Sequence, residues 1–169
     1  MKKVSVIPIC QNFWQRKYPN FSFEWDKIWN NIPSTTREGR LISLNWKITS
    51  NIYPTKILLH KMKIENNDIC DICNEKDYVE HFFFFCKKIQ PIWLEANAII
   101  SLKVSKRVML THFDVLFGFQ QCKVKLQRDY VNSIIMIAKL SISKFRYGNH
   151  PNLLFLFKSE LRFRKLIEI

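Results

Sequence analysis

Glycine and proline are scarce in this sequence, with only 3 glycines and 6 prolines among 169 residues. Short strands need frequent turn residues, so this scarcity argues against a β sandwich and favours long helices. Long apolar runs are also missing, because charged residues recur throughout and no stretch reaches the roughly 18 to 20 apolar residues that cross a bilayer. We therefore expect a mainly α-helical protein that has no membrane partner.

Acidic residues are few as well, with 14 Asp and Glu against 27 Lys and Arg, a formal net charge of +13. The acids are scattered, without an Asp-Asp pair or a convincing carboxylate pair for two-metal chemistry. We therefore expect no enzymatic activity from the chain on its own. The positive excess attracts polyanions, which makes nucleic acid the first partner to consider.

The cysteine pattern does not suit a secreted disulfide scaffold. The five cysteines are an odd number, and Cys10 and Cys122 stand apart from a cluster of three that lies beside a histidine. The N-terminal MKKVSVIPIC is interrupted by Pro8, and no small-residue cleavage site follows it. We therefore expect an intracellular protein, nuclear or cytoplasmic and not secreted.

The segment 70–86, CDICNEKDYVEHFFFFC, has the ligand types and spacing of a zinc site. Cys70 and Cys73 form a Cys-x-x-Cys pair, which can supply two thiolates from one tight turn. His81 and Cys86 follow after a short return of the chain and can supply the other two ligands. Three sulfurs and one nitrogen without an open position are typical of structural zinc, so the sequence predicts one structural Zn²⁺.

The cysteine pair has other possible interpretations. A thioredoxin-like redox pair would normally lie in a βαβ pattern, which does not surround this segment. Core cysteines without a metal, as in a decayed site, are a second alternative. A finger with two histidines does not match the ligand types, and a RING would need eight ligands.

Four consecutive phenylalanines, Phe82, Phe83, Phe84 and Phe85, separate the histidine from the last cysteine. On a helical turn they fan through about 300°, so at least one is expected near the surface. They could clamp the metal loop between helices, or an exposed ring could stack on an unpaired base. We favour the structural use, and expect Trp93 on the next helix to support the loop too.

Apolar periodicity predicts a series of helices with recognisable ends. The expected segments are 23–32, ended by Pro33; a helix capped by Ser34 or Thr35, with Glu38 as the capping-box partner of Thr35, that stops near Asn51; a helix with Pro54 in its first turn; a helix with Pro91 in its first turns; a short helix or turn closed by Gly118; a long helix from Lys123 to about Tyr147; and a last amphipathic helix opened by Pro151.

The long helix has one broad apolar side, which should be buried. On the helical wheel Lys125, Arg128, Lys139 and Arg146 fall within an arc of about 60° away from that side. We call these four residues the basic arc. The predicted nucleic-acid contacts are the basic arc together with Lys87 and Lys88, and the alternative for each is a solvated basic face.

Several stretches together resemble the zinc-binding region at the C-terminal end of LINE-type (non-LTR) retrotransposon reverse transcriptases. In order they are WDKIW, LNWKITSNIYPTKILLHKM, CDICNEKDYVEHFFFFC followed by Trp93, and FDVLFGF. The distinctive Cys-x2-Cys-x7-His-x4-Cys pattern of that family matches 70–86 without a gap. The two consecutive aspartates of its polymerase palm are missing, so the resemblance implies a C-terminal fragment.

The predicted organisation has three parts: an N-terminal extension at 1–22, a helical reverse-transcriptase-type zinc-binding domain at 23–102 with its knuckle at 70–86, and basic amphipathic helices at 103–169 packed on it. The function we expect is a zinc-stabilised nucleic-acid-binding module that holds template RNA or target DNA near the polymerase. The alternatives are a scaffold that docks on the upstream reverse transcriptase body, and a truncated relic without a present role.

Overall fold

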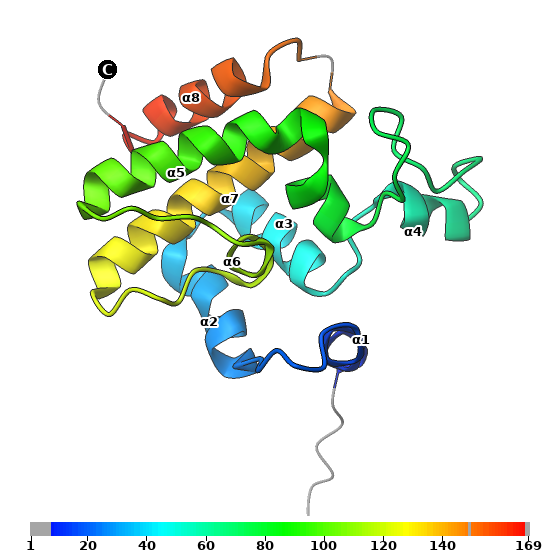
Figure 1. The fold of residues 1–169 in the computed structure, drawn as a ribbon, viewed down its shortest axis with the longest axis horizontal. Helices are drawn as coiled ribbons and strands as arrows, with labels where there is room; N and C mark the ends of the chain where they lie inside the picture. The colour runs from blue at the N-terminus through cyan, green and yellow to red at the C-terminus, as the bar shows by residue number, and fades with distance from the viewer. Residues whose placement is uncertain (1–7, 149, 168–169) are drawn as a thin grey trace, which may run out of the picture.

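The computed structural model describes residues 8–148 and 150–167. Its helices follow one another along the chain, with a long connection at 62–80 between α4 and η1, and the predicted mainly α class is confirmed (Figure 1). The elements are α1 (Ile9–Lys17), α2 (Trp25–Thr35), α3 (Gly39–Thr49), α4 (Lys56–Lys61), the π-helix η1 (His81–Phe85), the 3₁₀ helix η2 (Lys87–Ile89), α5 (Gln90–Val104), α6 (His112–Phe117), α7 (Lys125–Tyr147) and α8 (Leu153–Phe163).

Helix α7 lies at the centre of the molecule. It packs against α2, α3, α5 and α8, and every residue from Ile134 to Ile142 is buried. The surrounding helices cover it on several sides at once, so its middle has no solvent-facing side (Figure 1). The amphipathic pattern of the sequence therefore understates how much of this helix is inside.

The N-terminal segment belongs to the same hydrophobic core as the rest of the described chain. Trp14 of α1 is fully buried, and its indole N–H donates to the carbonyl of Thr49 at 2.8 Å. Phe117 of α6 meets the Trp14 ring edge-on at 5.1 Å. Part of the segment predicted as an extension at 1–22 therefore packs as an integral element.

The end of α6 shows why a glycine is needed at position 118. A Thr111–Asp114 capping box starts the helix, and Gly118 ends it with φ of 91°. A Cβ atom at this position would lie 2.1 Å from the buried amide of Asn31. Asn132 donates to that same amide's oxygen at 3.0 Å, so the contact cannot relax without breaking a buried hydrogen bond.

Several predicted helix boundaries are wrong, among them the placement of Pro54 in the first turn of α4, which begins at Lys56. Helix α2 continues past Pro33 to Thr35, because a proline in the last turn removes only one intrahelical hydrogen bond. Helix α3 begins at Gly39, so the predicted capping box of Thr35 and Glu38 does not form. The Glu38 carboxylate instead accepts from Arg164 at 2.9 to 3.0 Å.

No helix in the described parts of the chain is long and apolar enough to cross a membrane.

Candidate metal centre

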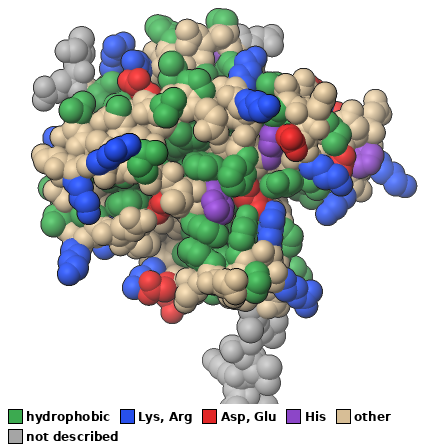
Figure 2. Space-filling view, viewed as in Figure 1, with side chains coloured by type: hydrophobic (Ala, Val, Ile, Leu, Met, Phe, Trp, Pro, Cys, Tyr) green, Lys and Arg blue, Asp and Glu red, His purple; other side chains and the backbone are tan. Residues whose placement is uncertain are grey.

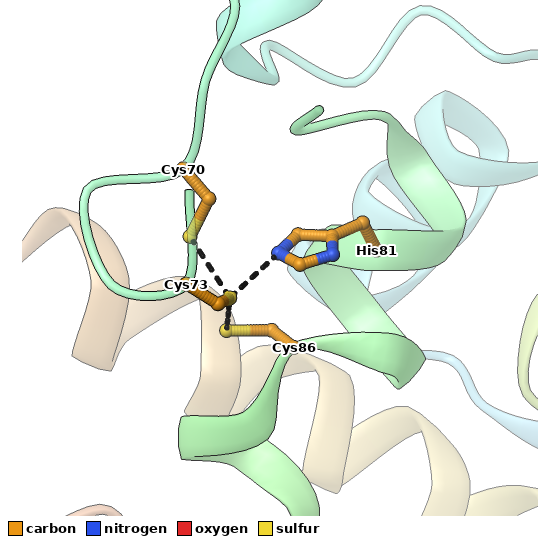
Figure 3. A group of neighbouring side chains, drawn as sticks. All are labelled: Cys70, Cys73, His81 and Cys86. Carbon is orange, nitrogen blue, oxygen red and sulfur yellow. Dashed lines mark hydrogen bonds between the residues drawn. The ribbon is translucent and has the colours of Figure 1, made fainter. Parts of the chain in front are cut away.

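A tight turn presents the first two candidate ligands. Ile69 and Lys76 form an isolated antiparallel bridge, and the Cys70 N–H donates to the carbonyl of Glu75 at 2.8 Å. Asn74 closes the turn with φ of 55°, a left-handed conformation that asparagine adopts more readily than most residues. The folded turn holds the thiols of Cys70 and Cys73 in one hollow (Figure 3).

A π-helical turn presents the other two candidate ligands. His81 and Cys86 lie five residues apart, and the Cys86 N–H donates to the His81 carbonyl at 2.9 Å, which is the i→i+5 bond of a π-helix. Cys86 then turns to an extended conformation, and its thiol points toward the Cys73 sulfur (Figure 3). A single hydrogen bond thus links the backbone of both residues.

The four side chains meet at distances that suit a tetrahedral zinc ion. The Sγ of Cys73 lies 3.7 Å from the Sγ of Cys70, 3.6 Å from the Sγ of Cys86 and 3.3 Å from Nε2 of His81. Zinc with sulfurs about 2.3 Å away would separate two sulfurs by about 3.8 Å, and a sulfur and a nitrogen by about 3.6 Å. All four ligand atoms lie within 4.8 Å of one another. The residues present therefore fit zinc.

Burial shapes the protonation of these groups. Desolvation lowers the pKa of His81, which favours the neutral imidazole that binds a metal. Desolvation also raises the pKa of Cys86 to about 12 in the absence of a metal. Burial opposes ionisation of Cys70 too, but hydrogen bonds from the backbone of Ile72 and Cys73 and the charge of Arg146 bring its pKa below the ordinary value. A bound cation would supply the stabilisation that buried thiolates need.

Arg146 of α7 approaches this cluster from outside. Its Nη2 lies 3.6 Å from the Sγ of Cys70 and 3.0 Å from a carboxylate oxygen of the buried Asp77. Its guanidinium also lies 4.0 Å from the centre of the Phe82 ring. Three thiolates and a zinc ion carry one net negative charge, and the Arg146 cation would lie beside it.

The aromatic residues around the cluster divide between core and surface. Phe82 and Phe83 are buried, Phe84 is half-buried and Phe85 is exposed. Trp93 is buried and its indole N–H donates to the Phe83 carbonyl at 2.8 Å, so it packs against this turn as predicted. The expectation that at least one phenylalanine reaches the surface is confirmed.

The predicted basic arc is not one exposed surface. Lys125 and Arg128 reach solvent, although Lys125 pairs with Asp129. The predicted exposed position of Lys139 is wrong: this side chain is buried, donates to the Val115 carbonyl at 2.8 Å, and desolvation lowers its pKa to about 7.

The prediction that Arg146 is available to contact nucleic acid is also wrong. Its side chain is 9% exposed because it is held between Asp77, Cys70 and the Phe82 ring. The predictions for Lys139 and Arg146 fail because a helical wheel assigns one buried apolar side and one exposed polar side, whereas α7 is surrounded by other helices. A usable signal was the position of Lys139, three and four residues after the apolar Met136 and Ile135.

Lys87 and Lys88 are exposed on η2, directly after the last cysteine. The ammonium group of Lys88 lies 5.3 Å from the centre of the Phe145 ring. Both side chains remain accessible to a polyanion beside the cluster. Sequence reasoning missed Asp77, whose buried carboxylate accepts from both the Lys56 backbone and Arg146.

The fold and the cluster together define a small helical protein with a closed Cys3His site that can hold zinc. A family model described as zinc-binding in reverse transcriptase matches residues 5–93, just over half of the 169-residue chain. The match includes all four candidate ligands and ends at Trp93. The chain therefore belongs to this family of reverse transcriptase zinc-binding regions. Searches among curated proteins and solved structures found no match.

Proposed function

We propose that the chain is a zinc-stabilised module from the C-terminal end of a LINE-type reverse transcriptase, and that it holds nucleic acid without catalysis. The observation that carries this proposal is the Cys3His cluster, whose sulfur separations of 3.6 and 3.7 Å suit one tetrahedral zinc. Its spacing, followed by Trp93, is the feature that favours the LINE-type assignment. With four protein ligands the zinc has no free position for a water, so its role is structural.

The charge balance supports nucleic acid as the partner. Of the 14 acidic residues in the chain, nine are paired with Lys or Arg in the described structure. Many cations, including Lys87 and Lys88, therefore remain available for phosphates. Lysine and arginine bind nucleic acid largely by neutralising phosphates and releasing counterions, which gives affinity with little sequence preference.

A scaffold that docks on the upstream polymerase body is the second candidate. Helix α5 exposes Leu94 and Leu102 at 68% and 83%, and apolar side chains also gather in the middle of the face shown in Figure 2. Such surfaces suit a protein partner. This function requires no affinity of the isolated chain for nucleic acid.

A binding titration separates the two functions. The zinc-loaded chain, with zinc content established by elemental analysis, is titrated into labelled single-stranded RNA and DNA at several salt concentrations. The proposed function predicts binding that weakens steeply with salt, with a log-log slope of about 0.7 per phosphate contacted. A folded, zinc-loaded chain without measurable affinity at low salt would favour the scaffold.

A further inference from the structure

The C-terminal parts of α5 and α8 lie near the N-terminal part of α7 on one side of the molecule (Figure 1). Residues from these three helices line a basic groove. Its volume is about 570 Å³. We define the groove by its four cations, Lys103, Lys158, Arg162 and Lys165, which line it together with apolar side chains. Lys and Arg side chains are also visible along that side in Figure 2.

The groove has a clear positive excess. Glu95 is the acidic side chain among its described lining residues, and it pairs with Lys158 at 3.0 Å. Lys103, Arg162 and Lys165 form no ion pair with any described residue. Three neighbouring cations that have no partner acid within 8–148 and 150–167 favour a polyanion.

Apolar and aromatic side chains line the groove together with its cations. Leu102 is 83% exposed, and the Tyr130 ring lines the same groove. The Tyr130 hydroxyl donates to the Leu166 carbonyl at 3.1 Å, which holds the ring in place. The ammonium group of Lys103 lies 6.0 Å from the ring centre, so a charge and an aromatic face are next to each other.

Cations that lie next to exposed apolar and aromatic side chains match a single strand better than a duplex. In a single strand the phosphates can meet the cations while unpaired bases contact the apolar side chains and stack on an aromatic ring. A duplex keeps its bases stacked inside, so it would use the charges and gain nothing from Leu102 or Tyr130. The chemistry therefore favours single-stranded nucleic acid over other polyanions.

We propose that this groove, and not the basic arc of α7, is the path of single-stranded nucleic acid on the protein. This inference rests on the proposed nucleic-acid function and specifies its location. It also agrees with the finding that Lys139 and Arg146 are engaged inside the fold.

The test compares two triple variants of the full zinc-loaded chain that lose the same charge. The groove variant is Lys103→Gln, Arg162→Gln and Lys165→Gln. Fluorescence anisotropy measures binding to a labelled 20-nucleotide oligo-uridine RNA, and to a duplex of equal length, across a salt series. The groove variant should lower the salt slope by about 2 for the single strand, since each lost contact removes about 0.7.

The control variant is Lys47→Gln, Lys61→Gln and Lys63→Gln, which are exposed and lie outside the groove. It should keep nearly the wild-type slope, because only the distant field of the protein changes. Circular dichroism and zinc content confirm that both variants fold. A wild-type preference for the single strand over the duplex is expected as well.

The outcomes distinguish the groove from the proposed function. If the wild type binds and both triples weaken binding equally, the groove assignment is wrong while nucleic-acid binding stands. If the wild type binds no nucleic acid, the proposed function and this inference both fail. If the groove variant instead loses binding only to vesicles of anionic lipid, the groove is a membrane contact and the inference is overturned.

Discussion

Replacing Arg146 by methionine tests whether the long helix and the metal centre form one unit. The change keeps an unbranched, mostly apolar side chain against Phe82 and removes the guanidinium. Asp77, which is 1% exposed at its side chain, would then lose its ion-pair partner at 3.0 Å. The Cys70 sulfur would lose its neighbouring N–H donor at 3.6 Å.

The expected loss follows from these contacts. Breaking a buried ion pair by removing one partner typically costs about 3 to 5 kcal/mol, because the remaining charge is uncompensated. Nη1 of Arg146 is buried without a hydrogen-bond partner among the described residues, so the pair is not fully satisfied in the wild type. We therefore expect a loss near the lower end, about 3 kcal/mol in the free energy of unfolding. Loss of an outer-shell donor should also weaken zinc binding by about 10- to 100-fold.

Two measurements check the prediction. Urea unfolding followed by circular dichroism, at a fixed excess of zinc, reports the stability change. Competition with a chromophoric chelator reports the zinc affinity of the folded chain. A double-mutant cycle with Asp77→Asn should show a coupling of about 1 to 3 kcal/mol between the two positions.

Arg128→Met is the matched control, because Arg128 lies on the same helix, reaches solvent and forms no ion pair with a described acid. It should change stability by less than about 0.5 kcal/mol. If Arg146→Met keeps the stability and the zinc affinity of the wild type, the reasoning is refuted. The ion pair with Asp77 and the contact with Cys70 would then contribute nothing measurable.

Three further predictions follow from the site and the fold. Purified chain should contain one zinc ion per molecule. Cys86→Ser should lose zinc and helical signal whereas Cys122→Ser should not, because structural zinc contributes roughly 10 to 16 kcal/mol in small modules. Equal zinc content in both variants by elemental analysis would contradict this. Lys139→Met should raise stability at pH 7 by about 2 kcal/mol, because the pKa near 7 reflects an uncompensated buried amine whose hydrogen bond to Val115 offsets part of the cost. Between pH 7 and 10.5 the Lys139 amine is protonated in the unfolded chain and neutral in the folded one, so the free energy of unfolding of the wild type should rise with pH over this range. Urea melts at several pH values should show that Lys139→Met lacks this contribution. The isolated chain, given template, primer, nucleotides and magnesium or manganese, should extend and nick nothing, and products from a preparation free of other polymerases would overturn its assignment as a non-catalytic module.

The cysteine and histidine cluster was predictable because its geometry is local. Cys70 and Cys73 share one turn, and a single i→i+5 hydrogen bond joins His81 to Cys86, so spacing along the chain is enough to bring the four together. Gly118 was predictable for a similar reason, since one residue's φ decides whether the helix can end there.

The environment of α7 was not predictable in the same way. A helical wheel assigns one buried side, but the contacts of α7 with α2, α3, α5 and α8 leave its middle buried all round. Lys139 and Arg146 are polar residues in a helix whose neighbours come from distant parts of the chain. Their partners, Val115 and Asp77, cannot be identified from periodicity.

By itself the sequence determined the helical class, the four candidate zinc ligands and the positive charge, because these depend on composition and on residues close together in the chain. Only the tertiary structure decided which cations reach solvent. Packing buried Lys139, placed Arg146 against Asp77 and brought Lys103 beside Arg162 and Lys165 in one groove. The physical reason is that a charge is accessible or engaged according to what distant segments place around it, and this depends on how the helices close over one core.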